Sequence, residues 1–115
     1  MTIAVIQSTA SGSRQAWHGQ DMLLALASMD LNPQLILTGD GLTLWHKHHD
    51  AHDNSRSLHK RYAMLALFDC PTPWVYEDEL FARGWNASEF IGAIEVLDRD
   101  TWQQRLASLE KVLTY

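Results

Sequence analysis

The stretch IAVIQSTASGS at residues 3–13 decides the fold class. Residues 3–6 are apolar and rich in isoleucine and valine, a composition typical of a buried β-strand. Serine and glycine residues then form a turn, and Ser13 can accept a hydrogen bond as the cap of a helix. Apolar residues recur at helical spacing from Trp17 to Ala27, which predicts an amphipathic helix. A strand, a turn and a helix in this order form the opening unit of an α/β fold.

The same alternation continues to the end of the chain. Further strands are predicted at residues 35–37, 74–76, 94–97 and 111–115, and the last of them is expected at a sheet edge. Such an order predicts one domain, residues 1–115, with a three-layer α/β/α architecture around a five-stranded, mainly parallel sheet.

Three further helices connect these strands, each with its own predicted cap. Leu58 to Ala66 carries one apolar face, with Asn54 or Ser55 as the expected cap. Asp78 is the expected cap of a short helix that Gly84 closes, and Asp100 is expected to cap the last helix with Gln103 in a variant of the capping box. Residues 42–54 are polar and stay unassigned.

Composition and charge narrow the function classes. The 115 residues carry 9 Lys and Arg against 14 Asp and Glu, a net charge of −5, which argues against a surface for nucleic acid. No apolar run approaches the length of a membrane span, and residues 1–6 have no basic segment of a signal peptide. The lone cysteine, Cys70, fits a reducing compartment. We therefore expect a cytoplasmic protein that contacts neither nucleic acid nor membrane.

In a parallel sheet, function is expected where the strands end. The crevice lies outside the carboxyl ends of the strands, where residues 7–9, 38–41 and 76–78 should converge. The turn at residues 8–13 has a single glycine and no lysine, so it matches no nucleotide-binding motif. We expect no cofactor.

Four histidines lie close together in the unassigned segment: His46, His48, His49 and His52. On a helix, His48 and His52 would share a face, which is a spacing that metal sites use. The segment offers no cysteine and no apolar frame, so a solvated loop is the favoured interpretation. A metal-responsive binding module stays open as an alternative.

Cys70 is the only thiol in the chain, and its surroundings disfavour the thiolate. It follows a helical pattern, so it lies near the negative end of a helix dipole, and Asp69 precedes it. Both features raise the pKa of a thiol, so Cys70 is interpreted as structural or incidental.

Several short motifs, taken in order, resemble one family. They are QSTA at 7–10, GQDMLL at 19–24, GDG at 39–41, LFD at 67–69, WV at 74–75, LFARG at 80–84 and VLTY at 112–115. The chain is similar over essentially its whole length to the DsrE/DsrF family of sulfur-relay proteins, and within it to the TusC (DsrF-like) subunits.

This resemblance implies a place in a heterohexamer of TusB-, TusC- and TusD-like subunits, two copies of each. That complex passes persulfide sulfur from a TusA-like donor to a TusE-like acceptor for 2-thiolation of the wobble uridine of tRNA. A DsrF-like subunit of a DsrEFH complex in sulfur oxidation is the alternative.

The resemblance also implies which subunit carries the sulfur. In the TusD-like (DsrE-like) sibling, a cysteine lies seven residues before the Arg-Gly pair that closes the helix after the third strand. Counting back from Arg83 and Gly84, this chain has Tyr76 in that place.

The residues around Tyr76 agree with that absence. Three acidic residues follow Tyr76 and would repel a thiolate. The sequence thus predicts a non-catalytic structural subunit that contacts its siblings through aromatic side chains. The residues expected at that interface are Trp45, Trp74, Tyr76 and Trp85. A direct sulfur carrier that uses Cys70 is the alternative within the same pathway.

Overall fold

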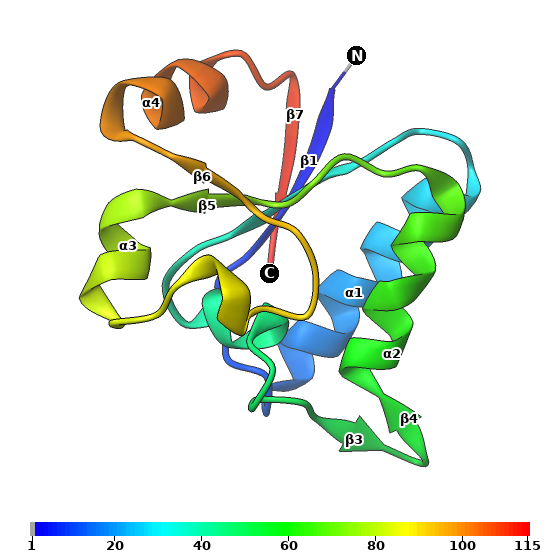
Figure 1. Cartoon of the computed structure of the whole chain (residues 1–115). Coiled ribbons are helices and arrows are strands. Elements are labelled where there is room, and N and C mark those ends of the chain that lie inside the picture. The colour runs from blue at the N-terminus through cyan, green and yellow to red at the C-terminus, as the bar shows by residue number, and fades with distance from the viewer. Residues whose placement is uncertain (1) are drawn as a thin grey trace.

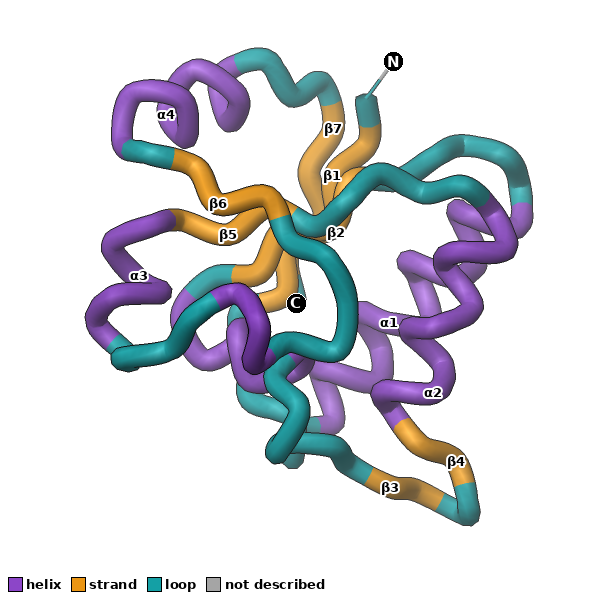
Figure 2. Tube along the Cα trace, viewed as in Figure 1, coloured by secondary structure: helices purple, strands orange, loops and turns teal. Residues whose placement is uncertain are grey.

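The computed structural model describes residues 2–115. Five strands form one sheet: β1 (Ile3–Gln7), β2 (Gln34–Leu37), β5 (Trp74–Tyr76), β6 (Glu95–Leu97) and β7 (Lys111–Thr114). Their order is β6-β5-β2-β1-β7, and every pairing is parallel (Figures 1 and 2). The predicted α/β class, the five-stranded parallel sheet and the edge position of the last strand are confirmed.

Helices and short turns fill the connections between the strands. The α-helices are α1 (Arg14–Ser28), α2 (Leu58–Tyr62), α3 (Glu77–Ala82) and α4 (Arg99–Ala107). The 3₁₀ helices are η1 (Gly39–Trp45), η2 (Ala63–Phe68) and η3 (Ala87–Glu89). The strands β3 (His52–Asp53) and β4 (Arg56–Ser57) form a small hairpin outside the main sheet. Within residues 2–115, none of these helices has the length and apolar character that crossing a bilayer requires.

Ser13 is the cap of α1, as predicted, and accepts a hydrogen bond from the backbone of Ala16 at 3.1 Å. The cap of α2 is Ser57, not Asn54 or Ser55. Asn54 and Ser55 instead have φ angles of 50° and 69° and turn the hairpin, because asparagine and serine tolerate or stabilise tight turns.

The two other predicted acidic caps are also displaced. Asp98, not Asp100, caps α4 and accepts a hydrogen bond from the Thr101 backbone at 2.8 Å. Asp78 lies inside α3, which begins one residue earlier, after Tyr76. Gly84 ends this helix with a φ of 68°, as its place after Phe81 and Ala82 predicted.

The register divides the sheet into two unlike faces. Val5 lies beside Leu35, and Leu37 lies beside Val75, so all four point to the same side. We call this side the core face, because these residues join the main hydrophobic cluster with buried residues of α1, α2, η2 and α3. We call the other side the α4 face, since α4 is the helix that contacts it through Trp74 and Tyr76 of β5. Figure 1 shows α3 and α4 on opposite sides of β5 and β6.

The unassigned segment after β2 supplies a part of the core. Leu42 and Leu44 of η1 are fully buried, and Trp45 is 6% exposed. Gly41 makes this possible, because a Cβ there would lie 1.9 Å from the Gln7 carbonyl oxygen. The polar composition of residues 42–54 concealed this buried turn.

Candidate functional site

Tyr76 stands at the carboxyl end of β5, where related subunits are expected to carry sulfur. Its ring stacks on Trp102 of α4, with centroids 5.4 Å apart. Its hydroxyl donates a hydrogen bond to Asp78 Oδ2 at 2.9 Å. This bond to a carboxylate raises the pKa of Tyr76, with smaller effects from desolvation and from the charge of Asp78. Tyr76 is therefore a neutral, positioned phenol.

The first turn of α3 concentrates negative charge next to that phenol. Glu77, Asp78 and Glu79 are its first three residues. Carboxylates are stabilised at a helix N-terminus, so these three already occupy the favourable end of the α3 dipole. A further anion at the end of β5 would meet their repulsion.

The carboxyl ends of β2 and β5 are tied together by α3. Glu79 accepts a hydrogen bond from the Gly39 backbone at 2.5 Å. Arg83 donates to the Gly39 carbonyl at 3.0 Å and to Asp40 at 2.8 Å. Because Gly41 lies against the Gln7 backbone, the structure brings the three predicted segments to one edge of the sheet.

Gln7 is fully buried beneath this edge, and both ends of its side chain are bonded. Its Nε2 donates to the Ala16 carbonyl at 3.0 Å, and its Oε1 accepts from the Tyr62 hydroxyl at 2.5 Å. Gln7 is thus a structural anchor between β1, α1 and α2.

Cys70 lies before the amino end of β5, away from the predicted site. It is half-buried and lines a mainly apolar cavity of about 390 Å³ together with Trp45 and Tyr62. Burial raises the pKa of the Cys70 thiol, and the neighbouring Asp69 raises it further. The thiol form is therefore favoured at neutral pH.

The histidine segment is more ordered than the sequence indicated. His46 is 4% exposed, not solvated as expected. Its Nε2 lies 3.1 Å from Glu89 Oε2, and its ring stacks on Trp85 with centroids 4.0 Å apart. The sequence could not show this, because Glu89, Trp85 and Phe90 are distant from His46 along the chain and meet it only in the fold.

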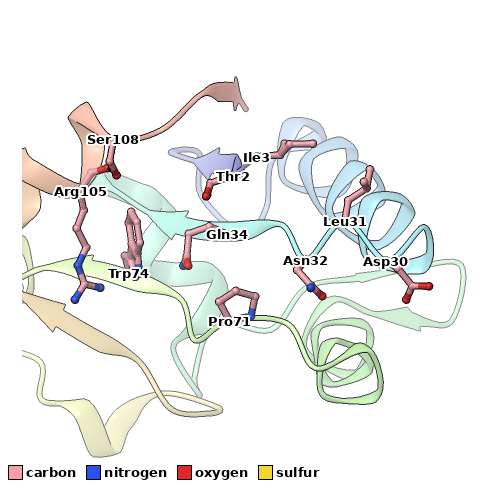
Figure 3. Close-up of a pocket in the computed structure, with 10 residues that line it drawn as sticks. All are labelled: Thr2, Ile3, Asp30, Leu31, Asn32, Gln34, Pro71, Trp74, Arg105 and Ser108. Carbon is pink, nitrogen blue, oxygen red and sulfur yellow. The ribbon is translucent and has the colours of Figure 1, made fainter.

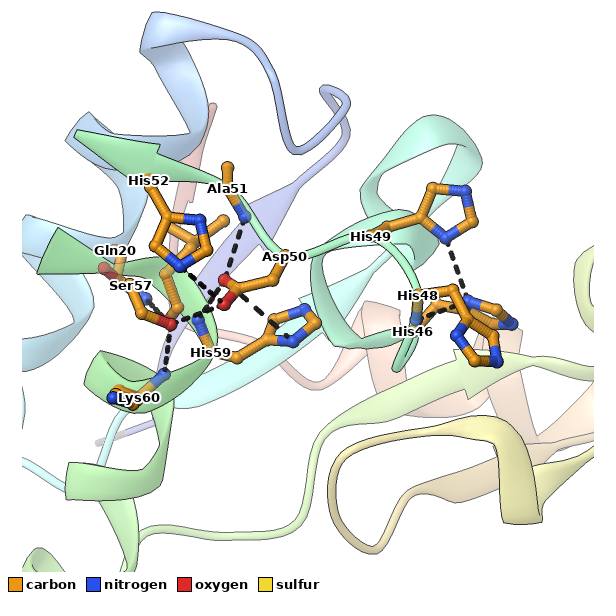
Figure 4. Close-up of polar contacts among 11 residues, drawn as sticks. Gln20, His46, His48, His49, Asp50, Ala51, His52, Ser57, His59 and Lys60 are labelled. Carbon is orange, nitrogen blue, oxygen red and sulfur yellow. Dashed lines mark hydrogen bonds and ion pairs between the residues drawn. The ribbon is translucent and has the colours of Figure 1, made fainter. Parts of the chain in front are cut away.

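Within residues 2–115, no group of three or more histidine, cysteine or acidic residues is arranged to hold a metal ion. His48 and His52 are exposed, and His52 points to Asp50, at 3.5 Å from Oδ2. Figure 4 shows Asp50 between His52 and His59, separate from His46 and His49. The four histidines therefore divide between two polar clusters.

The four aromatic residues expected at a partner interface have different surroundings. Trp45 belongs to the core, where its Nε1 donates to the Gly92 carbonyl at 3.3 Å, so it offers little surface to a partner. Trp74 and Trp85 are half-buried, like Tyr76. The Arg105 guanidinium lies 5.3 Å from the Trp74 ring.

A second cavity, of about 730 Å³, opens at the amino ends of the strands (Figure 3). Trp74 and Arg105 lie on one side of it, and Asp30, Leu31 and Asn32 lie on the other. It is remote from Tyr76, at the opposite end of β5, and no cluster of nucleophiles lines it.

Sequence reasoning missed three contributors to the carboxyl edge: Arg83, Glu89 and Trp102. A signal existed for Glu89, because Asn86 and Glu89 form a capping box around η3. The N-x-x-E pattern is visible in the sequence, but the reach of Glu89 to His46 is not.

A model of the DsrE/DsrF-like family matches residues 1–115. The chain belongs to the DsrE/DsrF-like family. The solved structures include the YchN protein of E. coli, with a TM-score of 0.79 and 19% identity, covering 99% of this chain and 97% of that one. This likeness shows the fold. A search of curated proteins finds no match. Membership of the family supports a role in sulfur relay.

Proposed function

We propose that this chain is a structural subunit of a sulfur-relay complex, which carries no sulfur itself and positions the sibling that does. The observation that carries this proposal is the state of the β5 terminus. A stacked and hydrogen-bonded phenol, Tyr76, occupies it, and three carboxylates follow.

Electrostatics supports the proposal. A persulfide is carried on a thiolate, and a thiolate is stabilised by a free helix N-terminus or by a nearby cation. Here the N-terminus of α3 already faces Glu77, Asp78 and Glu79. At 4 Å, two like charges near a protein surface repel by about 4 kcal/mol before salt screening.

Cys70 is the alternative carrier, and its surroundings oppose that role. Burial and Asp69 raise the pKa of its thiol, whereas sulfur-transfer cysteines depend on a lowered pKa. Cys70 also lies before the amino end of β5, whereas Tyr76 is the last residue of this strand.

Apolar groups that are exposed or half-exposed on both faces of the β5–β6 end of the sheet support docking of a sibling there. Phe81 of α3 is 66% exposed, and Val96 of β6, which lies beside Val75 on the core face, is 38% exposed. Trp74, Tyr76 and Trp85 add half-buried rings. Aromatic side chains of this kind are favoured at protein interfaces.

The partners proposed are TusB-like and TusD-like siblings in a TusBCD-type complex, with indirect links to a TusA-like donor and a TusE-like acceptor. Its product would be 2-thiolated wobble uridine in tRNA. A DsrEFH-type complex in sulfur oxidation has the same need for a scaffold subunit. The acceptor that binds the purified complex decides between the two pathways.

The test is co-expression with candidate DsrE-like and TusB-like siblings, followed by purification through a tag on this chain. We expect a complex in which a persulfide donor adds sulfur to the sibling and not to this chain. A chain that remains monomeric beside both siblings would overturn the proposal.

A further inference from the structure

Glu89, His46 and His49 form a continuous chain of polar contacts. Glu89 Oε2 lies 3.1 Å from His46 Nε2, and His46 Nδ1 lies 2.9 Å from His49 Nδ1. Figure 4 shows His49 directed at the buried His46. This series of contacts runs from the Glu89 carboxylate, through the buried imidazole of His46, to the half-buried imidazole of His49.

The hydrogen bonds determine the tautomers. The His48 backbone N–H donates to His46 Nδ1 at 3.3 Å, so this nitrogen is an acceptor. A neutral imidazole has one donor and one acceptor, so His46 Nε2 carries the proton that it donates to Glu89. His49 must then donate through Nδ1. Its Nε2 is left as an acceptor with a free lone pair.

At pH 7 the groups of this series of contacts are in the protonation states that a proton acceptor needs. The hydrogen bond from His46 lowers the pKa of Glu89, so Glu89 is a carboxylate. Burial lowers the pKa of His49, as do the nearby His46, His48 and Arg83, so His49 is neutral at pH 7. His59 of α2, which lies 4.0 Å from Asp50, is also kept neutral because burial lowers its pKa, and His49 and His46 lower it slightly further.

A positive charge can be accommodated on His46. Its ring stacks on Trp85 with an interplanar angle of 28°, and Glu89 lies against its Nε2. An imidazolium over an indole face gains a cation–π attraction, and the carboxylate adds a charge-assisted hydrogen bond. The guanidinium of Arg83, the residue that follows α3, lies 5.2 Å from the same Trp85 ring and opposes a positive charge in this cluster.

We propose that Glu89, His46 and His49 form a proton relay, and that His49 Nε2 accepts the proton of a thiol or persulfide S–H carried by a docked partner. The inference rests on the proposed function for the source of that sulfur. The S–H proton moves to His49 Nε2, and the Nδ1 proton of His49 moves to His46 Nδ1. The partner is left as a thiolate, and His46 becomes an imidazolium paired with Glu89.

The acid strengths of the side-chain groups that a partner could present favour a thiol as the proton donor. A thiol, with a pKa near ~8.5, is a stronger acid than a phenol or an ammonium with a pKa near ~10, so it is the group among these that a neutral imidazole deprotonates most readily. Cys70 is not that thiol, because it lies before the amino end of β5 and not beside η3. The thiol must belong to another chain. His49 contacts the reacting group, and His46 and Glu89 are positioning residues.

The first experiment tests the relay in the isolated chain, through long-range ¹H–¹⁵N spectra at pH 7.5. We expect protons on His46 Nε2 and His49 Nδ1, with His46 Nδ1 and His49 Nε2 unprotonated. Glu89→Gln retains the acceptor for the Asn86 backbone but replaces the charge-assisted hydrogen bond of His46 by a neutral one, so the ¹H resonance of His46 Nε2–H should move upfield. A proton on His49 Nε2, or an unchanged His46 Nε2–H resonance in Glu89→Gln, would overturn the relay.

The second experiment tests the sulfur assignment in the co-purified complex, through the rate at which iodoacetamide alkylates the sibling's cysteine at pH 7. His49→Gln should slow it at least about tenfold, and His52→Gln, on the separate Asp50 cluster, should not. Equal rates in all three complexes would overturn the sulfur assignment. Failure to form a complex overturns the proposed function instead, while the spectra still decide the relay.

Discussion

The two faces of the sheet differ in how completely they are covered. On the core face, Val5, Leu35, Leu37 and Val75 are at most 1% exposed and pack with buried residues of α1, α2, η2 and α3. On the α4 face, Ala4 and Ile36 are also fully buried, but Trp74 and Tyr76 are only half-buried. The covering helix α4 has no buried residue and contacts β5 through Trp102 and Arg105. Stability thus depends mainly on one face, and the other keeps aromatic surface that a partner can use.

The strongest test of this difference is Leu37→Ala on the core face. Leu37 is fully buried at the centre of the sheet, so the substitution should lower the free energy of unfolding by about 3 kcal/mol. Urea unfolding measures the loss. Val112→Ala on the opposite face is the matched control, since Val112 is 44% exposed, and its loss should stay below about 1 kcal/mol. Equal losses would contradict the difference between the faces.

Trp102→Ala should have a smaller effect on stability. It removes the stack on Tyr76, and such aromatic pairs contribute about 1 kcal/mol beyond their buried area. Gln103→Ala, in an exposed position of the same helix, serves as the control in the same unfolding measurement. A loss as large as that of Leu37→Ala would show that α4 closes a second core.

Acidification should lower the free energy of unfolding, because the buried His59 resists protonation in the folded state. Burial lowers its pKa in the folded state, so the unfolded chain binds more protons below its ordinary pKa of about 6.5. The contribution of neutral His59 to the free energy of unfolding is therefore fully present above that pH and decreases as the pH falls through it. We expect a lower urea midpoint at pH 5.5 than at pH 7.5.

His49 contributes in the same direction, because its pKa is also lowered. His59→Gln should reduce the difference between the two urea midpoints, whereas His18→Gln, at an exposed position of α1, should leave it unchanged. An equal pH dependence in wild type and His59→Gln would contradict the role of burial at His59.

Cys70→Ser should have the smallest effect. Cys70 is half-buried and outside the carboxyl edge, so we expect a change within about 0.5 kcal/mol in unfolding and no change in complex formation. Alkylation by iodoacetamide should reach half its maximum rate above pH ~8.5, the ordinary thiol pKa, because burial and Asp69 raise the pKa of this thiol. A midpoint below that value would restore Cys70 as a candidate carrier.

The sequence predicted what depends on local pattern. The strands, the Ser13 cap and the end of α3 at Gly84 follow from composition and turn chemistry within a few residues. Hydrophobic periodicity also located Leu23 and Tyr62, which are buried as their spacing indicates.

Features that depend on distant contacts were not predictable. The β3–β4 hairpin has two residues per strand, too few for an alternating pattern. His46 lies among polar neighbours in the sequence, and its burial results from Trp85 and Phe90, which pack on it from another segment. The sequence did not identify Ser57 and Asp98 as the caps, because each turn offers several residues that can cap a helix.

The central claim is that Tyr76 and its acidic neighbours leave this subunit without a sulfur-carrying group. Intact-mass spectrometry after exposure to a persulfide donor tests it most directly, on the isolated chain and on the complex with its siblings. We predict added sulfur on a sibling and an unchanged mass for this chain in both samples. Sulfur bound to this chain and passed on to an acceptor would contradict it.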